Sequence, residues 1–128
     1  MEGIKEEIED RETFYIGDVD MTFTDSITID LGGITCVITA VESTHTDGST
    51  LIYVPEEKVL FLGDCVYGRR YNGVYGYKKE YLDRLKETIS NFDVDYYIIS
   101  HEEVFDKTMM EKFWIDLEAN GPFLIGEC

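Results

Sequence analysis

The stretch that most constrains this chain is residues 34–41, ITCVITAV, which is nearly continuously apolar and β-branched. Such a run is typical of a β-strand covered on both faces, because a half-exposed strand alternates apolar with polar residues. Alternation of that kind occurs just before it, where Ile27, Ile29 and Leu31 are separated by polar residues. The Gly32-Gly33 pair between the two runs predicts a hairpin turn.

The rest of the chain predicts an α+β protein. Further strands are expected at residues 51–54, 59–62 and 96–100, with short candidates at residues 13–16 and 21–23. Two amphipathic helices are expected, one over residues 77–91 and one beginning at Thr108, where Thr108 and Glu111 form a capping-box pattern. This order of elements indicates a mixed β-sheet with the helices on one face.

Acidic residues dominate the charge of this 128-residue chain. Its formal net charge is −16, and residues 1–12 are the richest part, with six acidic against two basic side chains. Nucleic acid and anionic membranes bind clustered Lys and Arg, so neither is expected as a partner. By length we expect one domain, with residues 1–12 as a solvated acidic arm and residues 13–128 as the folded part.

The three cysteines, Cys36, Cys65 and Cys128, are widely spaced and odd in number. This pattern does not suit a disulfide framework and favours a reducing compartment. Cys65 is expected to be a small buried residue. No apolar run has the length of a membrane span and no signal peptide is evident, so we expect a cytoplasmic protein.

Three polar side chains lie next to strand-like runs and are the candidates for a functional site. His45 lies in the loop STHTDGS at residues 43–49, Asp64 follows the run at residues 59–62, and His101 follows the run at residues 96–100. Ligand sites gather at strand ends, and two imidazoles with a carboxylate suit a divalent transition metal. The same residues also fit a plainer interpretation, in which the histidines are solvated and Asp64 belongs to a turn.

Taken together and in order, these motifs resemble the metallo-β-lactamase superfamily. The resemblance rests on His45-Thr-Asp-Gly-Ser, on Tyr53-x-Pro55 and on the run Lys58-Val-Leu-Phe-Leu-Gly-Asp64, and it extends over about residues 20–115. It implies that His45 binds one metal, that Asp64 bridges two metals and that His101 binds the second. The implied cofactor is a divalent metal, with zinc expected first and iron or manganese as alternatives.

The chain departs from this family in its first half. The His-x-His-x-Asp-His cluster, which supplies most of the remaining metal ligands, is missing, and no histidine precedes His45. The family fold is a four-layer αβ/βα sandwich of two similar halves, and this chain resembles only the C-terminal half. We therefore expect half a sandwich with an uncovered sheet face, which either a homodimer or a missing N-terminal half would complete.

The function implied by the resemblance is that of a metal-dependent hydrolase domain, incomplete on its own. In such a domain a metal-activated water attacks an ester, amide, thioester or phosphodiester of a small-molecule substrate. The alternative is a non-catalytic dimeric or partner-binding module with a vestigial metal site.

Residues 65–76 are rich in tyrosine and glycine and are expected to form a long loop just after Asp64. Within it, Tyr67, Arg69 and Arg70 are candidates for substrate binding, the arginines for an anionic group. An ordinary surface loop explains the same residues equally well.

Overall fold

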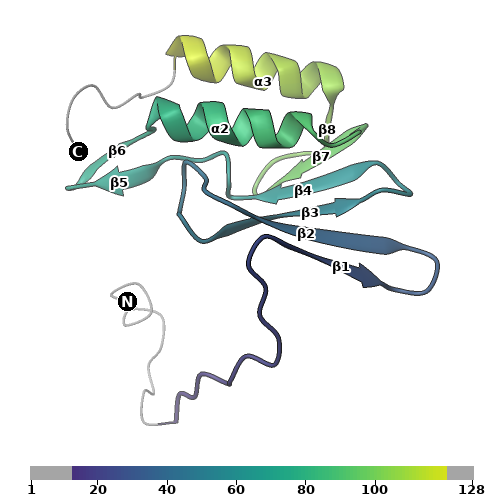
Figure 1. Cartoon of the computed structure of the whole chain (residues 1–128). Helices are drawn as coiled ribbons and strands as arrows, with labels where there is room; N and C mark the ends of the chain where they lie inside the picture. The colour runs from purple at the N-terminus through teal and green to yellow at the C-terminus, as the bar shows by residue number, and fades with distance from the viewer. Residues whose placement is uncertain (1–12, 121–128) are drawn as a thin grey trace.

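The computed structural model describes residues 13–120, which form a mixed β-sheet with two helices on one face (Figure 1). The acidic arm expected at residues 1–12 and Cys128 lie outside the described residues. The elements are β1 (Ser26–Asp30), β2 (Thr35–Val41), β3 (Ser49–Val54), β4 (Val59–Gly63), β5 (Arg69–Tyr71), β6 (Val74–Gly76), α2 (Lys79–Ser90), β7 (Tyr96–Ile99), β8 (Phe105–Asp106) and α3 (Lys107–Asn120).

The six-stranded sheet has the order β1-β2-β3-β4-β7-β8, and β5 and β6 form a separate two-stranded sheet. Strands β1 to β4 are an antiparallel meander, and β7 then pairs with β4 in parallel. Such a parallel pair needs a crossover, which α2 provides. The predicted α+β class, with a mixed sheet and helices on one face, is confirmed.

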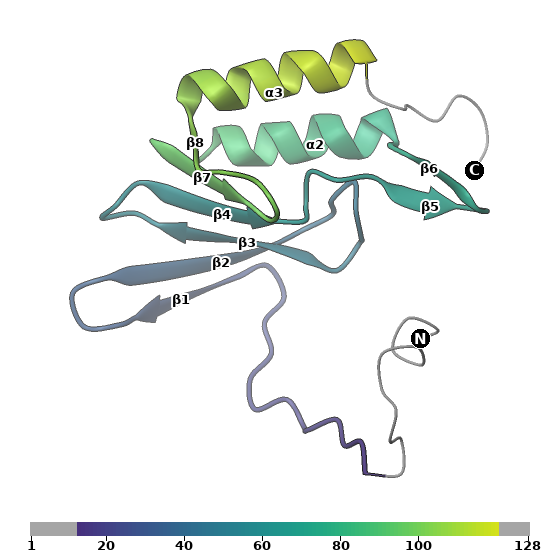
Figure 2. The ribbon, with the colours of Figure 1, turned by 180° about the vertical axis from the view of Figure 1, so that it is seen from behind.

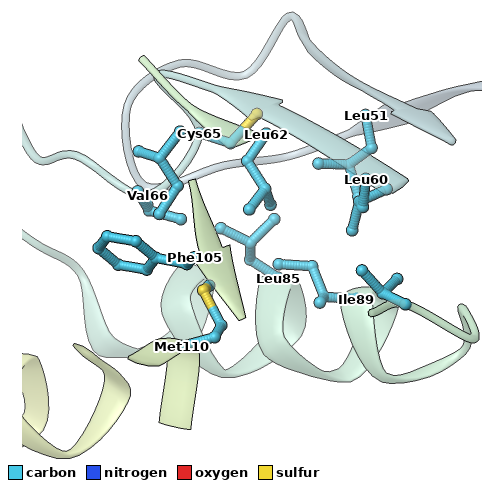
Figure 3. Close-up of a cluster of buried hydrophobic side chains, with 11 residues drawn as sticks. Leu51, Leu60, Leu62, Cys65, Val66, Leu85, Ile89, Phe105 and Met110 are labelled. Carbon is cyan, nitrogen blue, oxygen red and sulfur yellow. The ribbon is translucent and has the colours of Figure 1, made fainter. Parts of the chain in front are cut away.

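The hydrophobic core lies between the sheet and the helices (Figure 3). Leu51 of β3 and Leu60 and Leu62 of β4 are fully buried against Leu85 and Ile89 of α2. Burying each such side chain contributes roughly 1.5–3 kcal/mol. The alternation of buried and exposed residues in β4 follows from the two-residue period of a strand, so only its odd-numbered side chains face away from the helices.

The face of the sheet away from the helices carries a continuous line of apolar side chains. Direct cross-strand partners share a face of a sheet. The pairings of β1 with β2, β2 with β3, β3 with β4 and β4 with β7 therefore align one residue from each of five strands. We call these residues the apolar row: Ile27, Ile38, Ile52, Phe61 and Ile98.

Residues 13–25, called here the N-terminal segment, lie on the side of the sheet away from the helices, as both views show (Figures 1 and 2). The short strands expected at residues 13–16 and 21–23 are absent, because this part of the chain pairs with no neighbouring strand in residues 13–120. Alternation alone cannot make a strand, since the backbone of a strand needs a partner for its hydrogen bonds.

Two further expectations are corrected by hydrogen bonds. The loop expected at residues 65–76 contains the β5–β6 hairpin, whose turn residues Asn72 and Gly73 both have positive φ, as a tight hairpin turn requires. Helix α3 begins at Lys107 rather than Thr108, because the Asp106 carboxylate accepts a 2.8 Å hydrogen bond from the Met109 N–H and caps the helix.

Candidate metal site

The loop at residues 43–49 is held rigid by its own hydroxyl groups. The side chain of Ser43 accepts hydrogen bonds from the backbone N–H groups of His45 (3.2 Å) and Thr46 (3.1 Å). Ser43 and Thr44 are both fully buried, and the Thr44 hydroxyl lies 2.8 Å from the Cys65 carbonyl oxygen and 2.7 Å from that of Tyr67. Thr44 therefore fastens the His45 loop to the chain segment that follows Asp64.

The imidazole of His45 has one defined tautomer. Its Nδ1 lies 2.9 Å from the carbonyl oxygen of Gly68, and a carbonyl can only accept, so Nδ1 carries the proton. Nε2, on the other side of the ring, lies 3.9 Å from Oδ2 of Asp64. A backbone carbonyl that orients one ring nitrogen and leaves the other free is the usual outer support of a metal-binding histidine.

Asp64 and His101 lie close together because β4 and β7 are parallel neighbours, so the C-terminal ends of both strands are at the same end of the sheet. Oδ1 of Asp64 lies 3.7 Å from Nε2 of His101, too far for a hydrogen bond. This Oδ1 is a buried oxygen atom with no hydrogen-bond partner, although the aspartate as a whole is partly exposed. A buried oxygen left in this way costs free energy unless something else binds it.

His101 has a backbone φ of 67°, in the left-handed region that residues other than glycine rarely adopt. The conformation turns the chain sharply after β7, where the Ser100 N–H donates a 3.0 Å hydrogen bond to the Gly63 carbonyl oxygen. Backbone strain of this kind often accompanies functional sites, where the side chain must point in a fixed direction.

The three predicted site residues thus form two pairs that share one carboxylate. Each oxygen of Asp64 faces Nε2 of a different histidine, at 3.9 Å for His45 and 3.7 Å for His101. Across residues 13–120, however, no group of three or more Cys, His, Asp and Glu side chains is close enough together to hold one metal ion. The structure therefore brings the three predicted residues together around Asp64, as two side-chain pairs rather than as one three-ligand group.

Tyr67 supports the loop that carries His101. Its hydroxyl donates a short hydrogen bond to the Ser100 carbonyl oxygen, and its ring centroid lies 6.3 Å from that of His101. Burial, and then the nearby carboxylates of Glu102 and Asp64, raise the pKa of Tyr67 above its usual value. The phenol therefore remains a neutral hydrogen-bond donor at physiological pH.

The two arginines predicted for substrate binding have different surroundings. Arg69 is engaged in the protein: its Nε donates a 2.6 Å hydrogen bond to the Tyr71 hydroxyl, and Nη2 lies 3.0 Å from Asp47 in the His45 loop. The hydrogen bond to Tyr71 is the main cause that raises the pKa of Arg69. Arg70 is exposed and makes one 3.3 Å hydrogen bond, to the Gly73 carbonyl oxygen.

Cys65 is buried, and its thiol donates to the Thr50 carbonyl oxygen at 3.6 Å. Burial raises the pKa of Cys65, so the side chain is a protonated thiol at neutral pH rather than a thiolate ligand. The expectation of a small buried residue at this position is confirmed.

Two residues that matter to the site were not predicted from the sequence. Thr44 joins two parts of the site through its buried hydroxyl, and Gly68 supplies the carbonyl that orients His45. A β-carbon at Gly68 would lie 2.5 Å from the Gly76 carbonyl oxygen, so the hairpin packs against a residue that has to be glycine. The sequence contains only a weak signal for these two residues: Thr44 directly precedes His45, and Gly68 lies in a stretch that contains two further glycines.

No family model and no curated protein sequence matches this chain. Solved structures do match, and two of them show the extent of the similarity. A metallo-β-lactamase from Pontibacter korlensis is 19% identical and superposes with a TM-score of 0.59, over 80% of this chain and 50% of that one. An archaeal metallo-β-lactamase superfamily protein from Sulfolobus tokodaii is 20% identical, with a TM-score of 0.58, over 84% of this chain and 43% of that one. The chain has part of a metallo-β-lactamase fold.

The metallo-β-lactamase fold is present here only in part, because the chain spans about half the length of the solved structures that it matches. The expected fold, half of a four-layer sandwich, agrees with this coverage. Among the described residues, no helix is long and apolar enough to cross a membrane.

Proposed function

We propose that this chain carries one half of the active site of a metal-dependent hydrolase, with His45, Asp64 and His101 as metal ligands. The observation that carries the proposal is the Asp64 carboxylate, which turns one oxygen toward Nε2 of each histidine while its buried Oδ1 has no hydrogen-bond partner. Such an atom is explained by a cation, because carboxylate oxygen and neutral imidazole nitrogen are ligands that divalent metals prefer.

A divalent metal at this position supplies Lewis-acid chemistry and lowers the pKa of bound water to about 7. We propose zinc, with iron and manganese as alternatives. The protein's own contribution is to orient the two histidines. The Gly68 carbonyl oxygen accepts a hydrogen bond from Nδ1 of His45 and so directs Nε2 toward Asp64, and Tyr67 holds the chain next to His101.

The proposed substrate is a small molecule with an ester, amide, thioester or phosphodiester bond, and the proposed location is the cytoplasm. Arg70 has an exposed guanidinium and is proposed to contact an anionic group of the substrate. Arg69 and Tyr67 are proposed to line the substrate-binding side of the site as well. Both also hold its loops, Arg69 through Asp47 and Tyr67 through the Ser100 carbonyl oxygen. The net charge of −16 makes a nucleic-acid substrate a poor fit.

The second candidate function is a non-catalytic partner-binding or dimeric module with a vestigial metal site. The absence of a compact three-ligand group within residues 13–120 favours it, since zinc sites normally use three or four protein ligands. The two candidates differ in a measurable way, because the hydrolase needs a metal at Asp64 and the module does not.

Titration of the full chain with Zn²⁺, Fe²⁺ and Mn²⁺, followed by calorimetry, tests the proposal. We expect at least one metal to bind, and His45→Ala, Asp64→Asn or His101→Ala to weaken its binding by 10-fold or more. Asp83→Asn is the matched control, since Asp83 is an exposed carboxylate that pairs with Lys79 on α2. No binding of any of the three metals, or binding that His45→Ala leaves unchanged, would favour the vestigial module.

A further inference from the structure

Five neighbouring strands of the large sheet, β1, β2, β3, β4 and β7, place no charged side chain on the face away from the helices. Its inventory follows from the pairings and the two-residue alternation of each strand. We call this surface the open face: Ile27, Ile29, Cys36, Ile38, Ala40, Thr50, Ile52, Val54, Val59, Phe61, Tyr96 and Ile98. In a chain with 38 charged side chains, from 11 basic and 27 acidic, a surface of this size without charge indicates burial against another protein surface.

The open face is hollowed next to the candidate metal site. A groove of about 270 Å³ is lined by Ile52, Phe61 and Ile98 of the apolar row and by Thr50, Gly63 and Ser100. Gly63 and Ser100 directly precede Asp64 and His101 in the chain. Whatever covers this groove therefore borders the site on the side away from the helices.

The N-terminal segment carries large apolar side chains that are mostly exposed. Val19 is 75% exposed and Met21 is 65% exposed, and together with Phe23 they alternate with polar residues, as in a strand. The segment leaves the sheet at the end that carries the site, because the Asp25 carbonyl oxygen accepts a 2.8 Å hydrogen bond from the N–H of Ala40, at the end of β2. It then extends on the side of the open face (Figures 1 and 2).

We propose that the open face packs against the open face of a second copy of this chain, related by a twofold axis, with each N-terminal segment lying against the groove of its partner. A twofold interface requires a self-complementary surface. The open face meets this requirement because its twelve side chains are uncharged, so two strongly acidic chains can bring these side chains together without placing like charges in contact. Acidic side chains adjoin it: Asp106 of β8 is the direct partner of Tyr96, and the N-terminal segment carries Asp18, Asp20 and Asp25. Each copy also supplies both an apolar segment and a groove.

The flat area of the open face gives about half of a stable interface. Five strands of four to seven residues, about 4.8 Å apart and roughly 13–23 Å long, have a projected area of roughly 430 Å², so side-chain relief and the N-terminal segment have to supply the rest. Specific interfaces bury about 800 Å² of accessible surface on each partner. Face-to-face sheets pack about 10 Å apart through interdigitating side chains, so the apolar rows of the two copies would form a second core.

The inference is tested by the oligomeric state of the full chain. Sedimentation velocity from about 1 to 100 µM, with a chelator present, is expected to show a dimer. Phe61→Glu and Ile52→Glu are expected to raise the dimer dissociation constant at least 100-fold. The matched control is Ile115→Glu, since Ile115 is an isoleucine that is 62% exposed on α3, away from the open face.

Met21→Glu keeps the test decisive if the strand variants fail to fold. Met21 is exposed and lies outside the sheet, so this substitution leaves the monomer intact, and we expect it to raise the dimer dissociation constant at least 10-fold. A wild-type chain that is monomeric at 100 µM overturns the inference, as does a dimer that neither Phe61→Glu nor Met21→Glu weakens. Because the experiment is done without metal, its failure leaves the proposed metal site unaffected.

Discussion

Gly68→Ala tests whether the β5–β6 hairpin positions the candidate metal site. A β-carbon at residue 68 would lie 2.5 Å from the Gly76 carbonyl oxygen, 3.0 Å from the Gly76 carbonyl carbon and 3.0 Å from Cζ of Tyr75. Two of these contacts are with backbone atoms, so the hairpin must move by most of an ångström to relieve them. Overpacking of this kind costs about 1–3 kcal/mol of unfolding free energy.

The shift acts on the site as well as on stability. Gly68 provides the carbonyl oxygen that accepts from His45 Nδ1, so its displacement frees the imidazole to rotate. Loss of such an outer support typically lowers metal affinity by about 10- to 100-fold. We expect Gly68→Ala to show both effects, measured by urea unfolding and by calorimetric titration with the metal that the wild-type chain binds best.

Gly48→Ala is the matched control for this prediction. Gly48 lies in the His45 loop, and a β-carbon there would have no atom within 4 Å. We expect its unfolding free energy to stay within about 0.5 kcal/mol of the wild type, as for most surface substitutions. If Gly68→Ala is equally neutral in stability and metal affinity, the hairpin does not hold His45 and the reasoning fails.

Two further predictions concern buried polar groups. Thr44→Val removes the hydroxyl that contacts the Cys65 and Tyr67 carbonyl oxygens, and should lower the unfolding free energy measured in urea by about 1–3 kcal/mol. Thr44→Ser keeps the hydroxyl and is the control. An equal loss of unfolding free energy in the two variants would contradict this role. Burial raises the pKa of Tyr97 in the folded protein above its unfolded value of about 10. Stability from this group is therefore complete below pH ~10 and is lost as the pH rises through the raised folded pKa. The unfolding midpoint should fall in that window, and Tyr97→Phe should reduce the fall; an unchanged slope would refute the assignment.

Most of the sheet could be predicted because its strands are specified by local patterns. The alternation in β1, the β-branched run of β2 and the short apolar runs of β3, β4 and β7 each gave an expected strand close to the observed one. The same reasoning was wrong for residues 13–16 and 21–23, where the pattern of a strand is present but no neighbouring strand pairs with it. Pairing depends on the rest of the fold, which a local pattern does not contain.

The candidate site was predictable in its reactive side chains and not in their supports. His45, Asp64 and His101 follow from residue type, motif and position at strand ends, and the structure brings them to one edge of the sheet. The Gly68 carbonyl and the Thr44 hydroxyl act through contacts between segments more than twenty residues apart. The Asn72-Gly73 pair was the local signal for the hairpin, but residues 65–76 were predicted to be a loop and the hairpin was not expected.

The parallel pairing of β4 with β7 also has a consequence for biosynthesis. His45 and Asp64 lie beside strands of the meander and are synthesised before His101, which follows the crossover through α2. Non-local pairing of this kind forms slowly, because a long loop must close before its contacts form. The Asp64–His101 pair therefore exists only after the sheet has accepted β7, which makes it one of the last contacts of the candidate site to form.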